Sequence, residues 1–308
     1  MVVLTSLDRS RIGELIPRKE FFWLDLTGAS KAELEEMRRE FGLEPVPHHS
    51  PGSGRLVFLE REDYIAFPWK GVEPGSEHPV PFVVDVYVSG DWLITTHDEP
   101  VAELDQLGIR LARIGGQAEQ HVVARVLDVV CDSFVDVLSG IDLHIAEIET
   151  DVIANPTPQQ LSVITSLRRD LLDLRRIVNP QRDLLTRIGD DIAELPGLER
   201  GVRDYLRDVS KYLGRLADQI DATSELLTST VDVYLSTVSN RVNEVIRKLT
   251  IIATIFLPLS FVTGFFGQNF GWMVRHIDTL AGFLVYGIGG LAVAFVALIL
   301  WFRRSRVA

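Results

Sequence analysis

The sequence has little sulfur and no excess of positive charge. One cysteine, Cys131, stands among 308 residues, which excludes an internal disulfide framework and a cysteine-based metal cluster. It also points to a reducing compartment for the soluble part. Lysine and arginine number 31 against 43 acidic residues, a formal net charge of −12. This balance argues against a nucleic-acid binder, which needs a basic face, and suits a protein that handles cations.

Catalytic motifs are also missing. The sequence has no glycine-rich phosphate loop, no nucleophile elbow and no paired catalytic carboxylates, so we do not expect an enzyme. The first residues, MVVLTSLDRSRIGEL, lack an apolar core of signal-peptide length, and about 240 residues are therefore expected in the cytosol. We interpret His48, His49, His78 and His97 as ordinary solvated histidines, with chelation of a transition metal as the alternative.

Residues 1–117 alternate strand-like apolar runs with breaks rich in glycine and proline. The runs are residues 21–26, 56–67, 82–88 and 92–96. A helical pattern at residues 31–41 lies between the first two, and residues 44–54 and 71–81 have the composition of loops. The pattern predicts a small cytosolic α/β domain over residues 1–117.

From residue 118 onwards the strand signals disappear. Residues 118–153 and 158 to about 188 read as two amphipathic helices, separated by the breakers Asn155, Pro156 and Thr157. A third helix is expected from about Pro196 to Phe266, because its apolar positions recur about every 3.6 residues, the period of a straight helix. We therefore expect a helical domain and stalk over residues 118–248.

Two uncharged apolar stretches follow, residues 249–266 (18 residues) and residues 280–302 (23 residues). Each can cross about 30 Å of hydrocarbon, whereas two such helices in succession would need an unusually large soluble core. Arg247 and Lys248 precede the first span, and the basic tail 303–308 follows the second. The positive-inside rule then puts both termini in the cytosol and the loop 267–279 outside.

One continuous stripe along the first span has residues three or four positions apart. Its members are Asn243, Ile246, Leu249, Ala253, Leu257, Ser260, Gly264 and Gly267. A face that is polar at its ends and apolar in its middle can line a narrow channel, although plain lipid-facing and packing residues are the alternative. One helix cannot enclose a pore, so a ring of identical subunits is required.

Residues 243–270, NEVIRKLTIIATIFLPLSFVTGFFGQNF, closely resemble the first transmembrane segment of the CorA family of magnesium and cobalt transporters. That segment ends in a Gly-Met-Asn motif, normally preceded by Tyr and followed by Phe. Gly267 and Asn269 match the motif, whereas Gln268 replaces Met and Phe266 replaces Tyr. The likeness continues upstream through residues 231–245, 207–221, 167–185 and 132–157. Residues 23–45 resemble the family more weakly.

The resemblance implies a homopentameric funnel: an α+β cytosolic domain (an α/β sandwich), a long-helix stalk and a two-helix transmembrane hairpin in each subunit. Gly267, Gln268 and Asn269 would form the outer selectivity loop, where neutral amide oxygens contact a Mg²⁺ ion that keeps its water shell. Asn243 would form a second polar ring, and Ile246, Leu249 and Leu257 a hydrophobic constriction.

The resemblance also implies a regulatory metal site. Asp208 matches an acidic stalk residue that in the family binds regulatory Mg²⁺ together with an acid of the adjacent subunit, for which Glu73 and Glu77 are candidates. High cytosolic Mg²⁺ would close the pore.

The expected function is therefore influx of Mg²⁺, with Co²⁺ or Ni²⁺ as further ions, across the plasma membrane and with no cofactor besides the ion. The alternatives are a Zn²⁺ transporter, favoured if Gln268 and His276 matter, and a non-conducting membrane-anchored scaffold or sensor.

Overall fold

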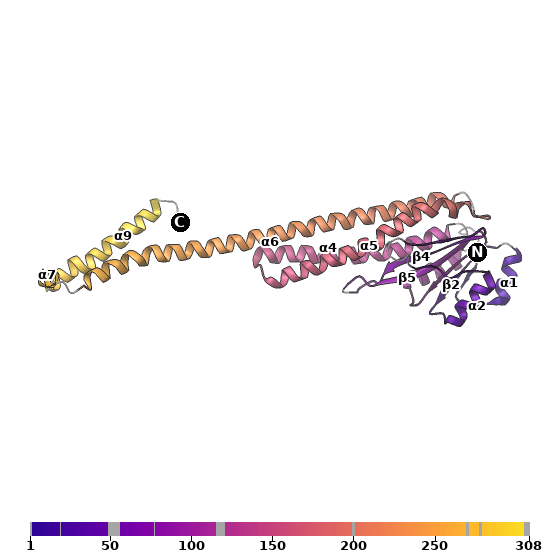
Figure 1. Cartoon of the computed structure of the whole chain (residues 1–308), viewed down its shortest axis with the longest axis horizontal. Helices are drawn as coiled ribbons and strands as arrows, with labels where there is room; N and C mark the ends of the chain where they lie inside the picture. The colour runs from indigo at the N-terminus through magenta and orange to yellow at the C-terminus, as the bar shows by residue number, and fades with distance from the viewer. Residues whose placement is uncertain are drawn as a thin grey trace. The chain divides into compact units, whose positions relative to one another are not determined.

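A computed structural model describes residues 2–18, 20–48, 56–76, 78–114, 121–198, 201–268, 271–276 and 279–304. The chain divides into two compact units, Met1–Val233 and Tyr234–Ala308, and the border between them lies inside one helix, α6 (Val202–Phe266). Each unit is described by itself below (Figure 1).

The first unit contains a mixed sheet and long helices. Its described strands are β1 (Val2–Leu4), β2 (Phe22–Thr27), β3 (Leu59–Glu60), β4 (Tyr64–Val72), β5 (Pro81–Ser89) and β6 (Trp92–His97). Its described helices are α1 (Arg9–Arg18), α2 (Lys31–Phe41), α3 (Ala102–Ile114), α4 (Val122–Ala154), α5 (Pro158–Glu194) and the first part of α6.

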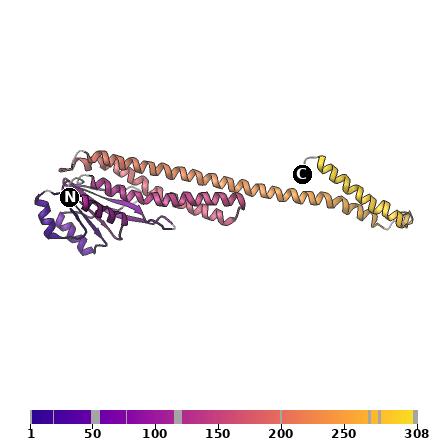
Figure 2. The ribbon, with the colours of Figure 1, turned by 180° about the vertical axis from the view of Figure 1, so that it is seen from behind.

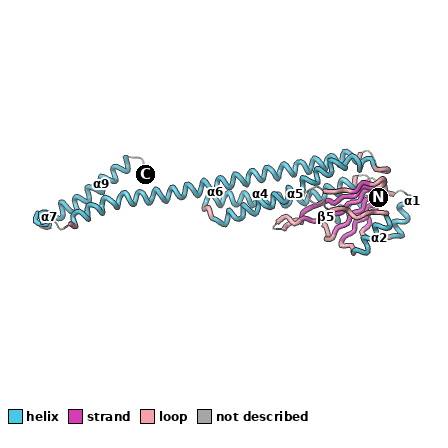
Figure 3. Tube along the Cα trace, viewed as in Figure 1, coloured by secondary structure: helices cyan, strands magenta, loops and turns pink. Residues whose placement is uncertain are grey.

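The sheet has the strand order β1-β2-β6-β5-β4-β3. Strands β1, β2 and β6 are parallel, and the remaining pairs are antiparallel. Successive residues of a strand point to opposite faces, so β2 presents Phe22 and Leu24 to one side and Trp23 and Asp25 to the other. Figure 3 shows the strands in magenta, with helices on both faces.

One face of the sheet packs against α1 and α2. Their buried Ile12 and Met37 join Phe22, Leu24 and Tyr87 of the sheet in one apolar core. Helix α2 is well delimited, because Ser30 and Glu33 form a capping box at its start and Gly42 ends it with a left-handed φ of 67°. The predicted helix over residues 31–41 is therefore confirmed.

The other face is tied to the long helices by buried hydrogen bonds from β4. Trp69 Nε1 donates to the Leu127 carbonyl of α4 (3.1 Å), and the Val72 amide donates to Ser133 Oγ of the same helix (3.1 Å). The Lys70 amide donates to Gln181 Oε1 of α5 (2.8 Å). Because each bond satisfies a buried polar group, the sheet and helices are fixed in one arrangement.

Helices α4 and α5 run beside the first part of α6 (Figures 1 and 2). The buried side of α6 repeats every three or four residues, as a helix packed along one face requires: Val202, Leu206, Val209, Leu213, Leu216, Ile220, Thr223, Leu227 and Thr230. Beyond Thr230, none of the α6 side chains whose exposure is described is buried. The unit border at Val233 therefore follows the end of this buried stripe.

The second unit contains the remainder of α6, α7 (Gly271–His276), α8 (Leu280–Gly282), the π-helical segment η1 (Phe283–Ile288) and α9 (Gly289–Arg304). Two described helical stretches, in α6 and over Leu280–Trp301, are long and apolar enough to cross a membrane. The predicted fold class, an α+β domain followed by long helices and two apolar helices near the end, is confirmed, and the sheet of that domain is mixed.

Several predicted boundaries were wrong. The single strand over residues 56–67 is divided, because Arg61, Glu62 and Asp63 form a polar turn in which the Arg61 amide donates to the Tyr64 carbonyl (2.9 Å). Strand β4 then continues to Val72, into the loop predicted at 71–81. Helix α6 begins at Val202 rather than near Pro196, since Gly197 has a φ of 102° and interrupts helical geometry.

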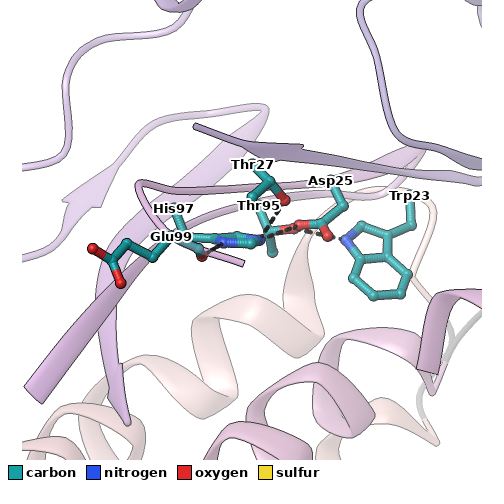
Figure 4. Close-up of polar contacts among 6 residues, drawn as sticks. All are labelled: Trp23, Asp25, Thr27, Thr95, His97 and Glu99. Atoms are coloured by element: carbon teal, nitrogen blue, oxygen red, sulfur yellow. Dashed lines mark hydrogen bonds and ion pairs between the residues drawn. The ribbon is translucent and has the colours of Figure 1, made fainter. Parts of the chain in front are cut away.

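The interpretation of His97 as a solvated histidine was also wrong. Only 5% of this residue is exposed, and its Nε2 lies 3.2 Å from Asp25 Oδ1 (Figure 4). The sequence alone does not indicate this contact, because Asp25 and His97 are brought together only by the pairing of β2 with β6. His48 and His78 remain half exposed and lie 3.4 Å from Asp85 and 3.1 Å from Asp170, while His49 lies outside the described residues.

Candidate functional site

The predicted pore-lining stripe lies on the last part of α6, in the second unit. All seven predicted positions are exposed in the single chain: Asn243, Ile246, Leu249, Ala253, Leu257, Ser260 and Gly264. At about 100° per residue they fall on one side of the helix. Leu257, in the middle of the apolar span, has 77% of its surface exposed.

The opposite side of the same span is partly covered. Its half-buried positions are Ile251, Thr254, Ile255, Pro258, Leu259 and Val262, and their mean direction lies about 180° from the stripe. In α9 the half-buried positions also form one face, with Gly290, Leu291, Ala294 and Leu298. The single chain leaves the stripe uncovered, as a helix that lines a shared pore must. It also leaves Ile252, Phe256, Phe261 and Phe265 exposed outside the stripe, so the role of the stripe in conduction stays a prediction.

Polar groups within the span find partners inside the helix. Thr250 Oγ1 donates to the Ile246 carbonyl (2.8 Å), and Thr254 Oγ1 donates to the Thr250 carbonyl (2.7 Å). These bonds remove the cost of placing hydroxyls in hydrocarbon. Pro258 has no amide hydrogen, so the carbonyl of Thr254 lacks the donor that other turns supply. That carbonyl is a backbone acceptor in the middle of the span.

The signature loop begins directly at the end of α6. The Gly267 amide donates to the Thr263 carbonyl (2.9 Å), and the Gln268 amide donates to the Phe265 carbonyl (3.2 Å). A Cβ atom at position 267 would lie 3.3 Å from the Thr263 oxygen, so glycine allows this tight turn. Gly267 and Gln268 are exposed, and Asn269 lies outside the described residues. In α7 the rings of Trp272 and His276 stack with centroids 4.5 Å apart.

The predicted regulatory acids are not brought together within one chain. Asp208 of α6 is exposed and pairs with Lys211 Nζ of the same helix (2.9 Å). Glu73 follows β4, where its amide donates to the Val80 carbonyl (2.9 Å), and Glu77 lies outside the described residues. No contact joins Asp208 to Glu73 in the described part of the chain. Any metal bound by Asp208 and an acid of the sheet domain would need ligands from two subunits.

Asp208 instead lines a groove of about 510 Å³ between α4 and the start of α6, together with Asp128 and Asp132. Sequence reasoning missed both acids, although their spacing of four places them on one face of α4. Burial raises the pKa of Asp128, the charge of Asp132 raises it further, and Arg215 opposes the shift. Tyr212 donates to Asp132 (2.9 Å), and burial together with this bond raises the tyrosine's pKa.

The groove therefore gathers acids whose repulsion is partly opposed by Arg215, and Arg125 also lines it. In the described ranges, no group of three or more histidine, cysteine or acidic side chains is arranged to hold a metal ion within a single chain. A cation attracted to this groove would be held loosely, through water, unless a second subunit supplied further oxygens.

The chain is similar to known proteins over most of its length. The chain is 31% identical over 296 residues to the Cobalt/magnesium transport protein CorA of Thermotoga maritima, covering 92% of this chain and 82% of that protein. It is 25% identical over 224 residues to the Zinc transport protein ZntB of Yersinia pseudotuberculosis, covering 72% of this chain and 67% of that protein.

Among solved structures, the CorA magnesium transporter of Methanocaldococcus jannaschii matches with a TM-score of 0.74 at 21% identity, covering 92% of this chain and 90% of that chain. This likeness shows the shared fold. The family model described as CorA-like Mg²⁺ transporter protein matches residues 18–304. The chain therefore belongs to the CorA-like Mg²⁺ transporter family.

Proposed function

We propose that the chain forms a homopentameric channel for divalent cations, which admits Mg²⁺ across the plasma membrane and has both termini in the cytosol. Co²⁺ and Ni²⁺ are further substrates of the same pathway. The observation that supports this proposal best is the uncovered stripe from Asn243 to Gly264, opposite the face that is half-buried within the hairpin. A ring of such stripes encloses a path that is polar at the cytosolic end and apolar in the middle.

In the proposed channel the ion meets the amide groups of Gln268 and Asn269 first. Mg²⁺ loses its water slowly, so oxygen atoms that hydrogen-bond to its hydration shell select it without trapping it. The constriction formed by Ile246, Leu249 and Leu257 closes the path by excluding water. Regulatory Mg²⁺ binds Asp208 of one subunit and an acid of its neighbour, and removal of that ion opens the pore.

Flux into proteoliposomes tests the channel directly. The wild-type chain should admit Mg²⁺ along an inside-negative potential, and Asn269→Ala should reduce the rate at least tenfold while Asp63→Asn, at an exposed turn, leaves it unchanged. Raised internal Mg²⁺ should inhibit the wild type, and Asp208→Asn should weaken that inhibition. A wild-type chain that admits no divalent ion would contradict the proposal and favour a non-conducting scaffold or sensor.

A Zn²⁺ transporter is the second candidate. The likeness to ZntB, the Gln268 variant of the signature motif and the exposed His276 favour it. Imidazole nitrogen is a good Zn²⁺ ligand and a poor Mg²⁺ ligand. Side-by-side flux of Mg²⁺ and Zn²⁺ decides between the two, with His276→Ala as the discriminating variant: it should reduce Zn²⁺ flux if Zn²⁺ is the substrate, and leave Mg²⁺ flux unchanged if Mg²⁺ is.

A further inference from the structure

We propose that a groove between the edge of the sheet and helix α3 binds a small organic ammonium compound, with the Asp25 carboxylate as its counter-ion. The groove has a volume of about 430 Å³ and lies between β1 and β2 on one side and α3 on the other. Its walls are largely apolar, with Val3, Leu104 and Ile109 among them, and Asp25 is the buried acid in its lining. This volume is typical of small-molecule sites.

Asp25 is held in place by a chain of hydrogen bonds (Figure 4). Trp23 Nε1 donates to Thr95 Oγ1 (2.8 Å), and Thr95 Oγ1 in turn donates to Asp25 Oδ1. His97 Nε2 lies 3.2 Å from the same oxygen. The other oxygen, Oδ2, has no hydrogen-bond partner among the described residues, although Asp25 is only 5% exposed. The network thus orients the carboxylate and leaves one oxygen free to accept a hydrogen bond.

The proton positions on His97 follow from its neighbours. Its Nδ1 faces the carbonyl oxygen of Glu99, which can only accept, so Nδ1 must be the donor. Its Nε2 faces Asp25 Oδ1, also an acceptor, with Thr27 Oγ1 at 3.3 Å. Nε2 can donate to Asp25 Oδ1 when the ring is charged, or accept a hydrogen bond from the Thr27 hydroxyl when the ring is neutral.

The charges favour a monovalent cation over an anion. Asp25 and Asp105, an exposed acid of α3, bring two carboxylates to the groove lining, against which His97 supplies at most one positive charge. A bare divalent metal fits poorly, because Thr5, Asp25 and Asp105 are the lining residues with side-chain oxygens, and metals of this kind take about six oxygen ligands. An ammonium group with an apolar body of about four to eight carbons matches both the carboxylate and the walls.

The position of the groove in the fold agrees with the binding of a small ligand. Strands β1, β2 and β6 are parallel, and Asp25 pairs with Thr95 in the second half of β2. Ligands of sheets with parallel strands bind outside the carboxyl ends of those strands. Gly108 of α3 also lines the groove, and a Cβ there would lie 3.6 Å from Val3 Cγ1, so a larger side chain can fill the space without striking backbone.

Hydrogen exchange on the full chain in lipid nanodiscs tests the proposal with n-butylammonium as the probe. The probe should slow exchange saturably in peptides from β1 and α3, whereas butyrate and n-butanol at equal concentration should not. Asp25→Asn should weaken this protection at least tenfold. Asp63→Asn, which removes an exposed acid from the turn before β4, should leave it unchanged and serves as the matched control.

Gly108→Leu provides a second variant, which places a side chain in the groove against Val3 and Trp23 and keeps Asp25, Thr95 and His97. If Asp25→Asn does not fold, Gly108→Leu alone decides. Protection by n-butylammonium that is tenfold weaker in Gly108→Leu than in the wild type then supports the site. Equal protection by n-butanol would mean that the groove binds any apolar compound, and would overturn the proposal. Unchanged butylammonium protection in folded Gly108→Leu would overturn it as well.

Discussion

Gly90 and Gly197 lie backbone against backbone. A Cβ atom on Gly90 would be 1.6 Å from the Pro196 carbonyl oxygen and 2.9 Å from Gly197 Cα. Gly90 belongs to the turn between β5 and β6, and Gly197 to the connection between α5 and α6. Two glycines therefore allow the turn between β5 and β6 to touch the connection between α5 and α6.

Substitution of Gly90 by alanine should destabilise the first unit by about 2–4 kcal/mol, because the added methyl meets backbone that cannot rotate away. The midpoint of thermal unfolding in detergent measures the loss. Gly140→Ala is the matched control, since nothing lies within 4 Å of its Cβ position inside helix α4. It should stabilise by about 0.5–1 kcal/mol, as expected for alanine in a helix. Equal midpoints for the two variants would refute the close contact.

The long apolar spans and the long helices were predictable, since both depend on local composition and period. Three elements of the first unit were not predicted: α1, α3 and β1. Strand β1 has three residues and α1 contains Pro17, so the sequence patterns of these two elements are weak. The Asp25–His97 pair and the Asp128–Asp132–Asp208 groove depend on residues about 70 or more positions apart in the sequence. Periodicity predicts which face of a helix is buried, but not which polar groups meet across two elements.

The His97–Asp25 pair should make stability fall at alkaline pH. Burial disfavours the charged ring, but the hydrogen bond and negative charge of Asp25 outweigh it, and the net pKa of His97 lies above its ordinary value of 6.5. The stabilisation is therefore complete below about pH 6.5 and is lost as pH rises through the folded-state pKa. Unfolding midpoints from pH 6 to 9 should decline in the wild type and change less in His97→Gln. Parallel curves for the two proteins would show that the ring stays neutral.

Asp85 should lower the stability of the fold at neutral pH. Replacing its carboxylate by a neutral group is therefore predicted to stabilise the protein. Burial raises the pKa of this carboxyl to about 6, the charges of His48 and Arg38 lower it, and Asp98 raises it again. The pKa of Asp85 in the folded state exceeds its value in the unfolded state, so this carboxyl group contributes fully to stability below about pH 4. That contribution is lost as the pH rises through about 6. At pH 7.5 the ionised form is disfavoured, so Asp85→Asn should gain about 1–3 kcal/mol.

The gain from Asp85→Asn should nearly vanish at pH 4, where both proteins are neutral at this position. Thermal unfolding at the two pH values measures the difference, with Asp63→Asn at an exposed turn as the control that should show no gain at either. A loss of stability at pH 7.5 would mean that the contact with His48, 3.4 Å away, outweighs the cost of burial.

Leu257 and Leu259 offer a matched pair for the pore prediction, because they are two residues apart on α6 yet face different ways. Leu257 is 77% exposed on the predicted stripe, whereas Leu259 is half-buried on the opposite side. If the stripe lines a hydrophobic constriction, Leu257→Asn lets water remain there and should raise Mg²⁺ flux about 3- to 10-fold at inhibitory internal Mg²⁺. Leu259→Asn places its amide on the half-buried side of the span and should leave flux unchanged or lower it. A higher flux from Leu259→Asn than from Leu257→Asn would mean that the other face of the helix lines the pore.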